Sequence, residues 1–127
     1  MYKNSAIKLT NKFILTLYTK DMILEIATFD IKENAQTAFM EAFQEAQLVV
    51  SKAKGFVGLE CQHCIEIPTK FVVLIHWETL EDHTIGFRES PLFTQWRALL
   101  SPHFQNPPVA EHFQTINKTE FTNEKSN

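Results

Sequence analysis

The chain has 127 residues, of which 44% are hydrophobic and 21% charged, so its size and composition are those of one globular domain with a single core. Its formal net charge of −3 argues against a nucleic-acid-binding surface, which needs an excess of Lys and Arg. No apolar run approaches the roughly 18 residues that span a bilayer. We therefore expect neither nucleic acid nor a membrane as a partner.

The first 21 residues differ in composition from the rest of the chain. They contain four Lys and no acidic residue before Asp21. Their apolar stretch, residues 13–18, is shorter than that of a signal peptide and is not followed by a small-residue cleavage site. We expect residues 1–21 to be either an extension or the source of an added edge strand at 13–18. Residues 22–116 are then the domain, and residues 117–127 a polar tail.

A strand and a long helix are predicted at the start of the domain. Residues 22–29 are rich in strand-forming side chains. Apolar residues then recur every three or four positions from Ala35 to Ala53, which predicts an amphipathic helix with Asn34 as its N-cap. Gly55 is expected to end this helix as its C′ residue.

A hairpin, two helices and a last strand complete the predicted domain. The hairpin strands, residues 56–67 and 71–77, flank a turn that contains Pro68. Thr79 and Asp82 resemble a capping box that begins a short helix, and Ser90-Pro91 begins a further helix that Ser101-Pro102 bends or ends. A last strand is predicted at 109–116. The order β-α-β-β-α-α-β predicts an α+β fold of the split, ferredoxin-like type, with an antiparallel sheet.

The third strand indicates a partner. Residues 71–77, Phe-Val-Val-Leu-Ile-His-Trp, are apolar at nearly every position, whereas a strand buried on one face alternates. Helices are expected to cover one face of the sheet, and 127 residues leave no layer for the other. We therefore expect a homodimer packed sheet against sheet. His76 and Trp77 point to opposite faces, and the sequence does not say which of them faces the helices.

The segments His76–Asp82 (HWETLED) and Gly86–Phe93 (GFRESPLF) resemble the antibiotic-biosynthesis monooxygenase domain. In that family of dimeric α+β barrels, an aromatic-Glu pair commonly closes the third strand, and a short helix leads to a Ser-Pro or Thr-Pro step. The similarity runs from about Met22 to Ile116.

The resemblance implies a monooxygenase that needs no cofactor. An electron-rich aromatic or quinol-type substrate would be deprotonated by a base in an apolar pocket and would react with oxygen directly. Many relatives carry a His in the helix after the aromatic-Glu pair and another after the Ser-Pro step, where this chain has Phe87 and Leu92. His83, one turn earlier, is the candidate catalytic base. The alternative is a non-catalytic ligand-binding or dimerisation module of the same fold.

The haem-degrading branch of the fold is a poor match. It depends on an Asn in the first strand, a Trp on the helix and a haem-ligating His one helix further. The corresponding positions here hold Thr28, Phe87 and Arg97. We therefore expect no haem and no other cofactor.

The candidate site combines His83 with a pocket for a small-molecule ligand. His83 shares a helical face with Leu80, Thr84 and Phe87, and the apolar neighbours predict that this face is buried. The candidate pocket residues are Thr28, His63, Trp77, Phe87 and Trp96. His63 is either a pocket base or a half-buried strand residue, and Trp96 also fits a core position in its helical stripe. Arg88 and Arg97 are expected to be solvated rather than to bind an oxyanion.

The segment Cys61-Gln62-His63-Cys64 suggests a metal or redox site at first sight. In a strand, however, residues three apart point to opposite faces and lie roughly 10 Å apart, which suits neither a disulfide nor a shared metal. No metal site is therefore expected. Two reduced cysteines favour a cytoplasmic location.

Overall fold

The structure, a computed structural model, describes residues 22–120. The predicted extension at residues 1–21 and the end of the predicted tail lie outside this range. The elements follow in the predicted order: β1 (Ile23–Ile31), α2 (Gln36–Val50), β2 (Phe56–His63), β3 (Lys70–Trp77), the π-helical turn η1 (Asp82–Phe87), α3 (Pro91–Leu100), the 3₁₀ turn η2 (Ser101–His103) and β4 (Phe104–Phe113).

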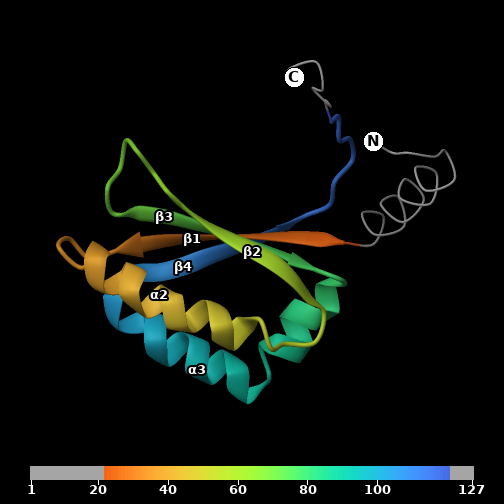
Figure 1. The fold of residues 1–127 in the computed structure, drawn as a ribbon, viewed down its shortest axis with the longest axis horizontal. Coiled ribbons are helices and arrows are strands. Elements are labelled where there is room, and N and C mark those ends of the chain that lie inside the picture. The colour runs from red at the N-terminus through yellow and green to blue at the C-terminus, as the bar shows by residue number, and fades with distance from the viewer. Residues whose placement is uncertain (1–21, 121–127) are drawn as a thin grey trace, which may run out of the picture.

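The four strands form one antiparallel sheet in the order β2-β3-β1-β4. Helices α2 and α3 lie side by side on one face of this sheet, and no described helix covers the other (Figure 1). This arrangement confirms the predicted split, ferredoxin-like α+β fold.

The two faces of the sheet differ in burial. On β3, Phe71, Val73, Ile75 and Trp77 are buried under the helices, while the residues between them are half-buried or exposed. Trp77 therefore faces the helices, and the exposed His76 lies on the opposite face, which we call the open face. The open face carries apolar side chains from β1, β3 and β4, namely Leu24, Ile26, Val72, Leu74, Val109 and Phe113.

Aromatic side chains fill the core between the sheet and the helices. Phe29 and Phe71 from the sheet each contact Phe39 of α2, with ring centroids 5.7 and 4.8 Å apart. Phe43 contacts Trp96 of α3 at 6.1 Å. Edge-to-face and tilted contacts of this kind stabilise a core beyond the burial of their area. This packing fixes α2 against the sheet and α3 against α2.

The ends of α2 differ from the prediction. The N-cap is Ala35 rather than Asn34, because Asn34 adopts a positive φ of 70° and turns the chain before the helix begins. The helix also stops earlier, at Val50, and two turns connect it to β2. Gly55, with φ 84°, ends this connection instead of serving as the helix C′ residue.

The bounds of two strands also differ from the prediction. β2 ends at His63, four residues before the expected Ile67. β4 begins at Phe104 instead of Val109 and includes Pro107 and Pro108. Proline is compatible with a strand at the edge of a sheet, where no neighbour requires its N–H, and the β1–β4 register shifts beside Asn106.

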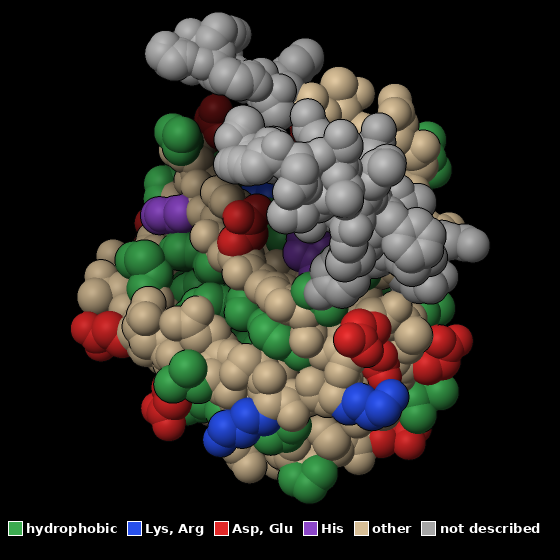
Figure 2. Space-filling model, turned by 45° about the vertical axis from the view of Figure 1, so that its right-hand side comes forward, with side chains coloured by type: hydrophobic (Ala, Val, Ile, Leu, Met, Phe, Trp, Pro, Cys, Tyr) green, Lys and Arg blue, Asp and Glu red, His purple; other side chains and the backbone are tan. Residues whose placement is uncertain are grey.

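The distribution of charge and the lengths of the helices bear on the two partners that the composition argues against. In the face drawn in Figure 2, Lys and Arg side chains are scattered among acidic ones and form no basic patch among the described residues. Within residues 22–120, no helix is long and apolar enough to cross a membrane.

Candidate functional site

A cavity of about 220 Å³ lies between the helix-covered face of the sheet and the segment formed by η1 and α3. Its walls are mainly apolar and aromatic. Three of its lining side chains, Glu25, His83 and Arg88, are ionisable. Such a cavity, apolar with a few polar groups, is typical of a small-molecule site. The lining residues are Glu25, Ala27, Phe29, Ile75, His83, Phe87, Arg88, Phe93, Trp96, Pro108 and Ala110.

A chain of polar contacts crosses the wall of this cavity. The Trp77 indole Nε1 donates a hydrogen bond of 2.9 Å to Glu25 Oε1, and His83 Nε2 lies 3.4 Å from the same oxygen. On its other side, His83 Nδ1 is 2.8 Å from His112 Nε2. The His83 ring also stacks on Trp77, with centroids 5.3 Å apart. His83 thus connects a buried carboxyl group with a half-buried imidazole.

Burial controls the charge states of the residues that form this series of polar contacts. Glu25 and His83 are only 6% and 3% exposed. Desolvation raises the pKa of Glu25 above its usual value, against the effects of the Trp77 hydrogen bond and of Arg88. Desolvation also lowers the pKa of His83 to about 4, with smaller contributions from Arg88 and His112. The pKa of His112 is lowered for the same main reason. His83 is therefore a neutral imidazole at pH 7.

Two tautomeric arrangements satisfy the hydrogen bond between the histidines. In one, His112 donates to His83 Nδ1, and the Nε2–H of His83 faces Glu25. In the other, His83 Nδ1–H donates to His112, and His83 Nε2 presents a lone pair. The 3.4 Å separation from Glu25 Oε1 is long for a hydrogen bond, so Nε2 is not firmly engaged.

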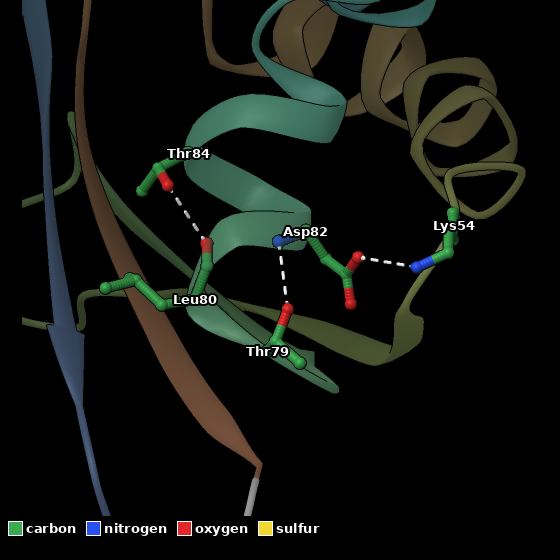
Figure 3. Close-up of polar contacts among 5 residues, drawn as sticks. All are labelled: Lys54, Thr79, Leu80, Asp82 and Thr84. Atoms are coloured by element: carbon green, nitrogen blue, oxygen red, sulfur yellow. Dashed lines mark hydrogen bonds and ion pairs between the residues drawn. The ribbon is translucent and has the colours of Figure 1, made fainter.

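Polar contacts anchor the beginning of the turn that carries His83. Thr79 Oγ1 accepts a 3.1 Å hydrogen bond from the backbone N–H of Asp82, and the Asp82 carboxylate pairs with Lys54 Nζ at 3.3 Å (Figure 3). Thr84 Oγ1 donates to the Leu80 carbonyl at 3.2 Å (Figure 3). The predicted capping role of Thr79 is thereby confirmed.

The π-helical winding of η1 changes which side chains face inward. The Arg88 N–H donates to the carbonyl of His83, five residues back, instead of to the residue four back. His83 and Phe87 are buried, as predicted. Leu80, expected on the same inward face, is 38% exposed, so that part of the prediction is wrong.

The structure brings together four of the six predicted site residues. His83, Phe87 and Trp96 line the cavity, and Trp77 stacks on His83. Thr28 lies on the open face, opposite the cavity. His63 is exposed and lies at the other end of the sheet, where it stacks on Phe71 and bonds to the carbonyl of Pro68.

Three ionisable residues of the cavity or of the polar contacts around it were not predicted as site residues: Glu25, Arg88 and His112. Glu25 could have been found, because it is the one charged residue on the inward side of a strand whose other inward residues are Ala27, Phe29 and Ile31. His112 is the cross-strand partner of Glu25, which only the sheet register reveals. Arg88 was expected to be solvated, and it is exposed, yet it also lines the cavity.

The two cysteines are free thiols. Burial raises the pKa of Cys61 to about 11, so it stays protonated at neutral pH. Among residues 22–120, no three His, Cys, Asp or Glu side chains are grouped so as to hold a metal ion.

The fold and the cavity define a class: split β-α-β-β-α-β domains with a cavity between the sheet and the helices. Residues 22–99 match the sequence pattern of the antibiotic biosynthesis monooxygenase family, and the chain belongs to that family. It is 40% identical over 95 residues to the uncharacterized protein YczJ of Bacillus subtilis, covering 75% of this chain and all of that protein.

Solved structures agree with this assignment. A candidate antibiotic biosynthesis monooxygenase from Bordetella bronchiseptica is 30% identical, with a TM-score of 0.74 over 76% of this chain and 99% of its own. SnoaB of Streptomyces nogalater, described as a cofactor-independent oxygenase, is 14% identical, with a TM-score of 0.66 over 77% of this chain and 96% of its own. At that identity, SnoaB supports the fold alone.

Proposed function

We propose that this protein is a cofactor-independent monooxygenase that oxidises an electron-rich phenolic or quinol-type molecule in the cavity beside His83. The observation that carries the proposal is a buried, neutral histidine that faces an apolar cavity and is hydrogen-bonded to a second histidine. Membership of the monooxygenase family supports the class of reaction.

In the proposed reaction, His83 Nε2 accepts the proton of the substrate hydroxyl. The proton on Nδ1 can then pass to Nε2 of His112, which is half-buried and closer to solvent. The substrate anion reduces molecular oxygen and forms a carbon–oxygen bond, and the resulting hydroperoxide loses water to give a quinone. The substrate loses two hydrogens and gains one oxygen, and the second oxygen atom leaves as water. No external reductant is needed.

The basicity of His83 limits the substrate class. A phenol with a pKa near 10, as in tyrosine, is about six units less acidic than the His83 imidazolium, an uphill transfer of roughly 8 kcal/mol. A turnover of about 10 per second allows a total barrier of roughly 16 kcal/mol. The transfer therefore fits within the barrier, and Arg88 in the cavity wall favours the substrate anion. Hydroxyl groups more acidic than a simple phenol are the preferred substrates.

We also propose that the protein works as a homodimer that is packed through the open face. The apolar residues of this face, defined above, are half-buried or exposed in the single chain, and the described helices cover only the opposite side (Figure 1).

The test is oxygen consumption and quinone formation with a panel of substituted hydroquinones and naphthols. We expect His83→Gln to lower kcat by about 100-fold or more, the range of general base catalysis. The matched control is His63→Gln, which removes an exposed histidine outside the cavity and should leave kcat unchanged. A His83→Gln protein that is folded and retains turnover within threefold would contradict the role of His83. If the wild-type protein oxidises none of the panel but binds some of it, a ligand-binding module is the better description.

A further inference from the structure

A second hollow, of about 350 Å³, adjoins the cavity between α3 and β4. We call it the groove. It shares Phe93, Trp96 and Pro108 with the cavity, so the two spaces lie next to each other along α3. The groove runs past Arg97 to Ser101, about 12 Å from Phe93 at 1.5 Å per helical residue. This length exceeds that of a single aromatic ring.

The groove is mainly apolar, with three uncharged polar side chains, Ser101, Gln105 and Asn106, and one charged side chain. Its lining includes Trp96, Leu100, Phe104 and the two prolines of β4. Arg97 is the one ionisable side chain among the lining residues, and no Asp or Glu is among them. A planar guanidinium beside apolar walls is suited to a carboxylate or a sulfonate.

Phe93 stands between two arginines. The guanidinium carbons of Arg88 and Arg97 lie 5.8 and 5.9 Å from the centroid of its ring. Arg88 lines the cavity, and Arg97 lines the groove. Within residues 22–120, neither arginine forms an ion pair with a carboxylate. The guanidinium of Arg97 is therefore free to bind an anion carried by a ligand.

We infer that the groove binds the far end of an extended aromatic ligand that carries an acidic group, and that Arg97 pairs with this group. This inference names the substrate class of the proposed oxygenase and in that respect rests on the proposed function. In such a complex the reacting ring lies in the cavity near His83, and the acidic substituent lies in the groove. Arg97 then acts in substrate selection and not in the chemical step.

The test uses two fluorescent probes that differ by one anionic group. 8-Anilinonaphthalene-1-sulfonate carries a sulfonate, and N-phenyl-1-naphthylamine has the same ring system without it. Binding of each probe to the full-length protein is followed by fluorescence titration. For Arg97→Gln, we expect the affinity for the sulfonate to fall about tenfold or more, the range of one charge-assisted contact, and the affinity for the neutral probe to change less than twofold. Arg97→Lys, which keeps the charge, should recover most of the loss.

The matched control is Arg88→Gln, which removes the other arginine beside Phe93. Arg88→Gln should lower the affinity for the sulfonate probe less than Arg97→Gln does. The inference is overturned if Arg97→Gln changes the affinity for both probes alike or for neither. It is also overturned if only Arg88→Gln lowers the affinity for the sulfonate. Because this assay needs no turnover, an inactive protein with intact discrimination refutes the oxygenase proposal alone. A protein that oxidises its substrate but does not discriminate between the two probes refutes only the inference about the groove.

Discussion

Acid should destabilise this protein through His83. Its pKa is about 4 in the folded protein, against an ordinary value of 6.5, so the unfolded chain binds a proton more readily than the folded one. Stability from this group is fully present above pH 6.5 and is lost as the pH falls toward 4. The complete loss corresponds to about 3 kcal/mol, and at pH 5 the expected loss is about 2 kcal/mol.

The measurement is urea unfolding of the wild type and of His83→Gln at pH 7.5 and 5.0, at one protein concentration. The groups that face His83 also titrate: His112 contributes in the same direction, and Glu25, whose pKa is raised, in the opposite one, while Arg88 stays charged. The difference between wild type and variant isolates most of the His83 contribution. We expect the wild type to lose about 2 kcal/mol more than the variant between the two pH values.

The control for this prediction is His103→Gln, which removes a half-buried histidine outside the chain of contacts. Its loss of stability between pH 7.5 and 5.0 should match that of the wild type. If His83→Gln and the wild type lose the same free energy within about 0.5 kcal/mol, the small difference expected of a neutral surface change, His83 does not have the low pKa on which this prediction and the preference for acidic hydroxyl groups depend.

Two further predictions concern the support of the site and the open face. Gly55→Ala should destabilise the fold by about 2 kcal/mol or more, because a Cβ at this positive-φ position would overlap the Asp82 carboxylate. Urea unfolding should show this loss of stability. The control is Gly58→Ala, where an added Cβ meets nothing within 4 Å. Sedimentation of the wild type should give twice the mass of one chain, and Leu74→Lys should give the mass of one chain. A monomeric wild type at micromolar concentration would rule out an interface above the roughly 1,000 Å² of specific contacts.

The order and type of the elements could be predicted because each relies on local patterns. Apolar spacing located α2, and the Ser90-Pro91 step located the start of α3. The end of α2 and the start of β4 could not be predicted in this way. The prolines of β4 argue against a strand unless the strand is known to lie at the edge of the sheet, and that depends on the whole topology.

The candidate site was predicted only in part. His83 was identified because its apolar neighbours implied burial, and the structure confirms that burial. Its two partners come from strands far away in the sequence. Glu25 precedes His83 by 58 positions, and His112 follows it by 29. The hydrogen-bonded chain exists because β1 and β4 pair in one register, a tertiary property that no local pattern contains.

The chain contains two tryptophans, and both lie at the site. Trp77 stacks on His83 and donates to Glu25, while Trp96 forms part of the wall shared by the cavity and the groove. Intrinsic indole emission therefore originates entirely from this region. Ligand occupancy and the protonation of His83 can be followed by the intensity and wavelength of that emission, without any added label.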